Sequence, residues 1–189
     1  RPFSGTFSQC GRSLLSLFCT GEEAGLLGSN YFAARPTVPA RRIVADLNID
    51  MFLPIQPIRG ITAYGIDESD LGDVARRVAK ADSLKVIPDA SPKRLYFVRS
   101  DQYSFIRHGI PSIFLDAGPT DSVAAKVEAD WNDAHYHKPS DDAAQTIDLG
   151  AVARYDRYVL AMTRAVADAS RKPQWKHESH FRSLGRSPR

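Results

Sequence analysis

Several common protein classes are disfavoured by what this 189-residue sequence lacks. No apolar run reaches the roughly 18 residues that cross a bilayer, so we expect no membrane span. The formal net charge is only +3, and outside the tail the basic residues do not cluster with aromatic ones, so we expect no nucleic-acid partner. The two cysteines, Cys10 and Cys19, decide little: they can pair in an oxidising compartment, but we expect Cys19 in a buried strand, where a free thiol is the commoner state.

Motifs of several enzyme classes are missing as well. The sequence has no Gly-x-Ser-x-Gly elbow for a nucleophilic serine and no glycine-rich phosphate loop ending in Lys-Ser or Lys-Thr. Neither cysteine has a nearby base that would mark a nucleophile, and no cysteines show the spacing of a metal site. Acyl-enzyme, nucleotide-binding and thiol chemistries are therefore disfavoured.

The sequence does contain an alternation of strand-like and helix-like segments. Residues 12–20 form a short apolar run without helical spacing, which predicts a buried central strand. The pattern that follows predicts strands at 43–50, 61–66 and 111–115, a possible short strand at 95–98, and helices at 24–34, after Asp67 or Ser69, from Ser100 and after Asp148. This alternation predicts an α/β fold with helices on both faces of the sheet. Because glycine weakens a helix, Gly25 and Gly28 suggest that the 24–34 helix packs closely against another segment.

Two stretches do not fit the alternation. Residues 117–147 form a long polar loop, which at that length is usually functional or locally folded. Residues 171–189 are basic and aromatic, and we expect them to be loosely held. We therefore divide the chain into a domain of residues 1–170 and a tail of residues 171–189.

Glu22 and Glu23 are the first candidate site residues, because they follow the first apolar run and precede a segment rich in small residues. Neighbouring side chains leave the backbone in different directions, so one carboxylate can bind a metal while the other faces substrate or water. The alternative is that both acids are solvated and stabilise the N-terminus of the next helix.

Asp50 and His137 are further candidates for a metal site. Asp50 ends the 43–50 strand, and open α/β sheets bind ligands at the carboxyl ends of their strands. His137 lies in the long polar loop, where His135 is an equally good candidate by spacing. Carboxylate and imidazole ligands suit zinc, and manganese or cobalt less specifically. The plainer alternatives are a turn acid for Asp50 and an exposed loop histidine for His137.

Five motifs occur in a fixed order along the chain: Thr20-Gly-Glu22-Glu23-Ala-Gly-Leu-Leu-Gly-Ser29, Asn48-Ile-Asp50-Met51, Ser100-Asp101-Gln102-x-x-Phe105, Gly109-Ile-Pro111 and His137-x-x-x-Asp141. The ordered set resembles the co-catalytic dizinc aminopeptidase family of metallopeptidases, over residues 12–170. The resemblance implies a three-layer sandwich whose central sheet is mixed and mainly parallel. It also implies a secreted or periplasmic protein, although no signal region is present in this chain.

The resemblance also implies roles for individual residues. Glu22 matches the general base of the family, and the matching zinc ligands are Glu23, Asp50 and His137. His137 is preferred over His135 because of its spacing to Asp141. Two further acids match residues that orient the ligands: Asp101 and Asp141. Where family members often carry histidine, this chain has Gln102, which keeps hydrogen bonding but loses a titratable group.

Two metal ligands of the family have no match in this chain, which limits the zinc binding and catalysis that we expect of it. The family's site for two zinc ions also uses a histidine from a His-x-Asp motif and a metal-bridging aspartate, both upstream of the Glu-Glu pair. This chain has no His-x-Asp and begins at Arg1, so we expect an amino-terminally truncated fragment that binds fewer zinc ions and catalyses little. The implied function is metal-dependent hydrolysis of peptide substrates, releasing N-terminal residues. The alternatives are a glutaminyl-cyclase-like acyltransferase and a metal-poor, non-catalytic binding domain.

Overall fold

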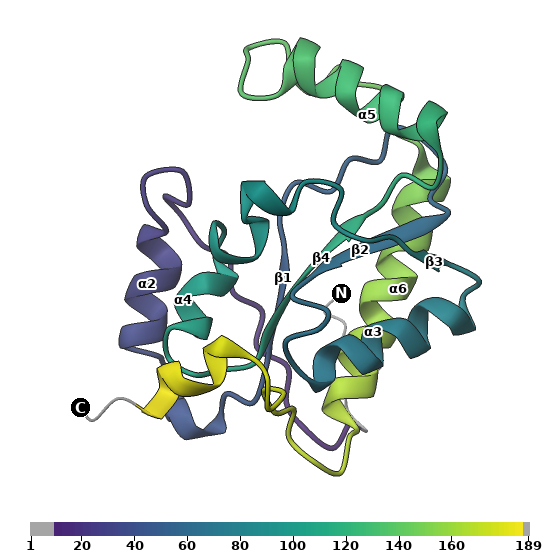
Figure 1. Ribbon diagram of the computed structural model, residues 1–189. Helices are drawn as coiled ribbons and strands as arrows, with labels where there is room; N and C mark the ends of the chain where they lie inside the picture. Colours follow the sequence, from purple (N-terminus) through teal and green to yellow (C-terminus); the bar gives the residue numbers. More distant parts are fainter. Residues whose placement is uncertain (1–9, 187–189) are drawn as a thin grey trace.

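The computed structural model describes residues 10–186, and it places a four-stranded sheet between two layers of helices (Figure 1). The strands are β1 (Asp46–Ile49), β2 (Gly60–Tyr64), β3 (Lys85–Val86) and β4 (Ser112–Ala117), in the order β1-β4-β2-β3. β1 pairs with β4 and β2 with β3 in parallel, whereas β2 and β4 are antiparallel. The predicted α/β architecture with a mixed, mainly parallel sheet is confirmed.

One face of the sheet is covered by α3 (Asp70–Ala81) and α6 (Leu149–Ala167). Ser69 caps α3 by accepting a hydrogen bond from the backbone N–H of Leu71, and Asp148 caps α6 in the same way. The apolar residues of both helices recur at helical spacing and pack on alternating residues of β2 and β4. This layer contains the main hydrophobic core.

The opposite face carries α2 (Leu27–Ala34) and α4 (Gln102–Ile106), which pack against each other. Ala33, Phe105 and Ile110 form a small second cluster there. The hydroxyls of Ser29 and Ser104, both buried, lie 2.8 Å apart across the two helices. These contacts place the beginnings of α2 and α4 close together, next to the carboxyl end of β1.

The predicted strand at residues 12–20 is not formed. The segment is extended, but no strand in the described part of the chain pairs with it. Its apolar side chains are largely exposed, with 94% of Phe18 accessible to solvent, because nothing in residues 10–186 packs over them. Cys19 is accordingly half-buried and its thiol is free, so the expectation of a buried strand position for it is wrong.

Two other predictions of secondary structure are corrected. Residues Tyr96–Val98 form a 3₁₀ turn, η3, because Leu95 adopts a left-handed backbone (φ 57°) that interrupts an extended chain. The 117–147 stretch contains a helix, α5 (Ser122–His135), whose N-cap Asp121 accepts hydrogen bonds from Val123 N and Ala124 N. Ala124, Val127, Trp131 and Ala134 recur at helical spacing in this helix, although none of its residues is buried.

The remaining segments are short. Three further 3₁₀ helices are η1 (Ala40–Arg42), η2 (Pro92–Arg94) and η4 (His180–Arg186). The chain after α6 is docked on the body of the molecule rather than loosely held, through Trp175 and its neighbours. Within residues 10–186 no helix is both long enough and apolar enough to cross a membrane.

Candidate active site

The Glu22-Glu23 pair sits in a tight turn that leads into α2. The carbonyl of Glu22 accepts hydrogen bonds from Gly25 N at 3.0 Å and Leu26 N at 2.8 Å. Leu26 has a left-handed backbone, so α2 begins at Leu27, three residues later than predicted. Both acids therefore lie in the turn, before the helix.

The two glycines near this turn have different reasons to be there. A Cβ on Gly28 would lie 2.7 Å from Thr20 N and 2.8 Å from Thr20 O, so α2 packs directly on the backbone that precedes Glu22. A Cβ on Gly25 would meet nothing within 4 Å, but the φ of +103° at this position favours glycine. Close packing thus explains Gly28, and backbone conformation explains Gly25.

Asp50 follows the last residue of β1 and is held by the start of α4. Ser100 Oγ donates a hydrogen bond of 2.7 Å to Asp50 Oδ2. Asn48 Nδ2 donates to Ser100 Oγ at 3.2 Å and to Gln102 Oε1 at 2.8 Å. Met51, immediately after Asp50, has a φ of 51°, which turns the chain away from the sheet. Asp50 is therefore fixed between β1 and the Ser100–Gln102 segment.

Gln102 has a structural place in this network. Its side chain is fully buried, and its amide nitrogen donates a 2.9 Å hydrogen bond to the carbonyl of Tyr96 while its oxygen accepts from Asn48. A neutral amide supplies a donor and an acceptor at once, which this position uses. The departure from histidine at Gln102 therefore matches its surroundings in this chain.

Glu22 lies among other carboxylates. Burial raises its pKa most, and the neighbouring charges of Asp50, Glu23 and Asp101 raise it further, while a hydrogen bond with Ser100 opposes them. Asp101 in turn lies near enough to Cys19 to raise the pKa of its thiol, and Asp101 Oδ1 is buried without a hydrogen-bond partner in the described residues. Four of the six predicted site residues are thus brought together here: Glu22, Glu23, Asp50 and Asp101.

His137 reaches the same place from the loop after α5. Its Nε2 lies 2.7 Å from Glu23 Oε1, with both side chains more than half exposed. The φ of His137 is 56°, a left-handed conformation that is uncommon outside glycine. The ring of Tyr136 stacks on His137 with centroids 3.9 Å apart, and burial followed by the charge of Glu23 raises the pKa of Tyr136.

The structure distinguishes His137 from His135. His135 Nδ1 lies 3.0 Å from the carbonyl of Ser140 and 3.1 Å from Gln145 Nε2, so this ring is held within its own loop. Asp141 is exposed, and among the described residues its side chain has no hydrogen bond or ion pair with the site. Asp141 is the one predicted residue that the structure does not bring to the others.

Two residues near the site were not singled out from the sequence. Ser100 bonds to Asp50, and Tyr136 packs on His137. Ser100 was quoted only as part of the Ser100-Asp101-Gln102 motif, and the one sequence signal for Tyr136 is its position beside His137. Adjacency alone does not tell which neighbour points toward a site.

The described residues do not form a complete metal centre. The donor types suit zinc, but Glu23 Oε1 and His137 Nε2 contact each other at 2.7 Å, whereas two ligands of a tetrahedral zinc ion lie about 3.4 Å apart. Within residues 10–186, no three side chains of His, Cys, Asp or Glu are placed to hold a metal ion together. In this arrangement Glu23 and His137 form a pair, and Asp50 is bonded to Ser100 instead.

Comparison with known proteins places this arrangement in context. Residues 3–163 match Peptidase family M28. The fold is similar to that of an aminopeptidase from Aneurinibacillus sp. strain AM-1, with a TM-score of 0.52 and 22% sequence identity over 77% of this chain. The match covers 31% of that aminopeptidase, so this chain spans about a third of its length. No curated protein matches the chain. The family match extends over most of the sequence, and the chain therefore belongs to peptidase family M28.

Proposed function

We propose that this chain carries part of the active site of a metal-dependent peptide hydrolase, most specifically a zinc aminopeptidase that releases N-terminal residues from peptides. The observation that carries the proposal is the convergence of Glu22, Asp50 and the Glu23–His137 pair at the carboxyl end of β1. These residues come from three separate parts of the chain. Family membership over residues 3–163 supports the same reaction class.

Glu22 is the proposed general base. It is less exposed than Glu23, and the carboxylates around it favour uptake of a proton. A base at this position accepts a proton from the attacking water and then returns it to the amine that leaves. Ser100 and Asp50, which are bonded to each other, both influence the pKa of Glu22.

Glu23, Asp50 and His137 are the proposed zinc ligands, and the ligand set is incomplete within the described residues. We propose that further ligands come from outside them, and that zinc supplies charge stabilisation for the reacting carbonyl when the set is complete. This chain alone is then expected to bind zinc weakly and to hydrolyse little. Asp101 and Asp141 remain proposed supporting acids; of these, only Asp101 lies at the site.

A second candidate function follows from one observation. The direct contact between Glu23 and His137, with no third ligand placed beside them in residues 10–186, favours a metal-poor homologue that binds peptides without cleaving them. In that case the carboxylates of the site serve as a recognition surface for the amino group of a peptide.

Hydrolysis of aminoacyl p-nitroanilides with added zinc tests the proposal, on this chain and on the full product of its gene. We expect activity in the full product, and Glu22→Gln should lower it about 100-fold or more at unchanged zinc content. Glu178→Gln, an exposed acid on the tail, is the matched control and should change neither quantity. Full activity of Glu22→Gln would refute the base assignment. A zinc-free, inactive full product would favour the binding domain.

A further inference from the structure

Residues 173–184, called the strap below, cross from the end of α6 to the opposite side of the sheet. The turn before α3 pairs with the strap through an antiparallel bridge between Ser69 and Trp175. Two backbone hydrogen bonds flank the bridge, from Asp70 N to Gln174 O at 3.0 Å and from Lys176 N to Glu68 O at 2.8 Å. Figure 1 shows this segment in yellow, running back toward α2 and α4.

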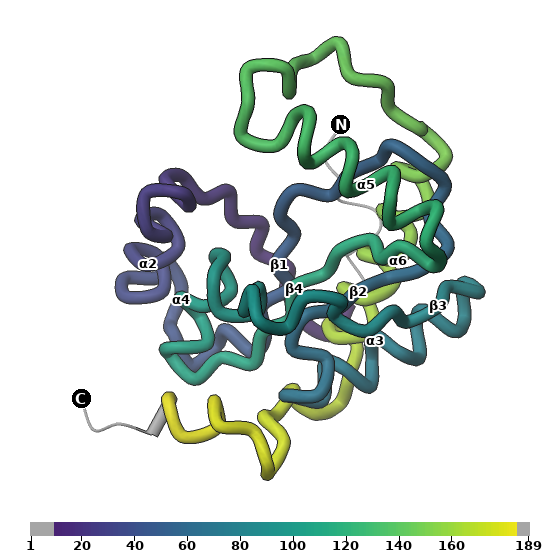
Figure 2. Tube along the Cα trace, turned by 45° about the horizontal axis from the view of Figure 1, so that its top comes forward, coloured from purple at the N-terminus to yellow at the C-terminus, as the bar shows by residue number. Residues whose placement is uncertain are grey.

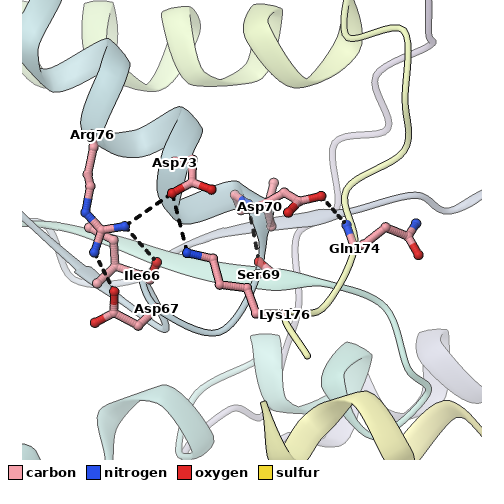
Figure 3. A network of polar contacts seen from close by, with 9 residues as sticks. Ile66, Asp67, Ser69, Asp70, Asp73, Arg76, Gln174 and Lys176 are labelled. Atoms are coloured by element: carbon pink, nitrogen blue, oxygen red, sulfur yellow. Dashed lines mark hydrogen bonds and ion pairs between the residues drawn. The ribbon is translucent and has the colours of Figure 1, made fainter. Parts of the chain in front are cut away.

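Polar side chains reinforce this attachment to α3 (Figure 3). The carboxylate of Asp70 accepts a 3.1 Å hydrogen bond from Gln174 N, and Lys176 Nζ lies 3.4 Å from Asp73 Oδ1. Arg76 pairs with Asp73 as well, at 3.6 Å. Exposed pairs of this kind contribute little each, so backbone pairing is the main polar anchor of the strap.

Aromatic side chains of the strap then reach the two ends of the α4 region. Trp175 Nε1 donates a 3.0 Å hydrogen bond to the carbonyl of Gly109, just after α4. Phe181 packs edge-on against Phe97 of η3, just before α4, with centroids 5.2 Å apart, and it also lies 5.7 Å from Trp175. The ring of Phe97 also packs so tightly on Gly65 that a Cβ built on Gly65 would lie 2.0 Å from it. The strap therefore holds both Phe97 and Gly109.

The residues between these two contacts include the part of α4 that holds the site. Ser100 bonds to Asp50 and Gln102 bonds to Asn48, and Asp101 lies near enough to Cys19 to raise the pKa of its thiol. We propose that the strap positions the Ser100–Gln102 segment at the candidate active site, with Trp175 and Phe181 as the positioning residues. The strap lies beyond residues 3–163, so it is not part of the family match.

Two measurements test this role, and neither depends on peptide hydrolysis. The first is amide hydrogen exchange of peptides that cover residues 98–108. We expect Trp175→Ala to speed exchange there at least about fivefold, while the centre of α6 is unchanged. Trp175→Phe, which keeps an aromatic ring but loses the N–H donor, should give an intermediate effect. His177→Ala, an exposed residue of the strap, is the matched control and should have none.

The second measurement is the reaction rate of Cys19 with a thiol reagent, in a Cys10→Ser background. Burial, followed by the charge and hydrogen bond of Asp101, raises the pKa of Cys19 to about 11, which keeps the thiol slow to react. If the segment with Asp101 loosens in Trp175→Ala, the thiolate fraction rises, and we expect a rate increase of about tenfold. A substituted core residue far from the strap, Leu84→Ala, controls for general loss of stability.

The two measurements distinguish positioning by the strap from a general loss of stability. Faster exchange at 98–108 and faster labelling of Cys19 in Trp175→Ala, but not in an equally destabilised Leu84→Ala, would support positioning by the strap. Equal effects in both variants, or none in Trp175→Ala, would overturn it. If near-ultraviolet circular dichroism shows that Trp175→Ala does not fold, Trp175→Phe and Phe181→Leu are compared with Leu84→Ala in its place. A failure of the proposed peptidase activity would leave these results unaffected.

Discussion

Replacing Asp46 by asparagine should stabilise the chain at neutral pH but not in acid. Asp46 begins β1, and its Oδ2 is buried with no hydrogen-bond partner in residues 10–186. Burial raises its pKa from 3.8 to about 7, with a smaller increase from the charge of Asp101, while a hydrogen bond with Ser112 opposes both. Ionising this carboxylate is therefore harder in the folded chain than in the unfolded chain.

The direction of the pH effect follows from linkage. Because the pKa of Asp46 is raised on folding, the contribution of Asp46 to the unfolding free energy is most favourable below pH 4. This contribution is lost as the pH rises to about 7. Raising the pKa of Asp46 from 3.8 to about 7 corresponds to a loss of at most about 4 kcal/mol in unfolding free energy. Asp46 keeps some exposure to solvent, so about half of this, roughly 2 kcal/mol, is a reasonable expectation. Asparagine removes this cost, since it stays neutral at every pH.

Urea unfolding of the wild type and Asp46→Asn at pH 4.5 and pH 8 measures the difference. We expect a gain in unfolding free energy of about 2 kcal/mol at pH 8 and a much smaller gain at pH 4.5. Asp121→Asn is a control that should change the unfolding free energy in the opposite direction. Hydrogen bonds from the backbone of α5 lower the pKa of Asp121, so its ionised form stabilises the folded chain. The same gain for Asp46→Asn at both pH values would refute the reasoning, because the effect would then not come from ionisation.

Two further predictions concern the turn at Glu22 and the choice of histidine. Gly28→Ala places a Cβ 2.7 Å from Thr20 N, so urea unfolding should show a loss of about 1–3 kcal/mol despite the better helix propensity of alanine. A neutral or stabilising result would mean that α2 does not pack on residue 20 as described. His137→Ala should weaken zinc binding about tenfold by isothermal titration calorimetry, whereas His135→Ala should leave it unchanged, because only His137 contacts Glu23. The reverse result would assign the metal to His135.

The parts of the fold that the sequence predicted correctly share a strong local signal. α3 has its apolar residues at helical spacing and a serine cap, and β4 is a continuous apolar run, so burial and local propensity agree. α5 was missed although Ala124, Val127, Trp131 and Ala134 recur at helical spacing, because charged and polar residues between them make the stretch polar as a whole. The strand predicted at residues 12–20 is not formed. An apolar run becomes a buried strand only when another segment covers it, and here these side chains are exposed.

Most of the predicted site residues lie close together in the structure, but their contacts could not be predicted from the sequence. Motif order was sufficient to select Glu22, Glu23, Asp50, Asp101 and His137, and the structure brings these together. It was not sufficient to show that Ser100 bonds to Asp50, that Gln102 bonds to Asn48, or that Asp141 lies apart. Those facts depend on how α4 packs beside β1 and β4, as Figure 2 shows, and on where the chain after α5 lies. Sequence spacing does not encode that packing.

The extended run at residues 12–20 has a consequence for the behaviour of the isolated chain. Leu14, Leu15, Leu17 and Phe18 are exposed, and no strand among residues 10–186 pairs with this backbone. An exposed apolar segment outside any sheet is a template for association between β-strands of different molecules. The concentration at which this chain is handled therefore determines how much of it aggregates, and a charged substitution such as Leu15→Lys is the simplest way to keep it dispersed.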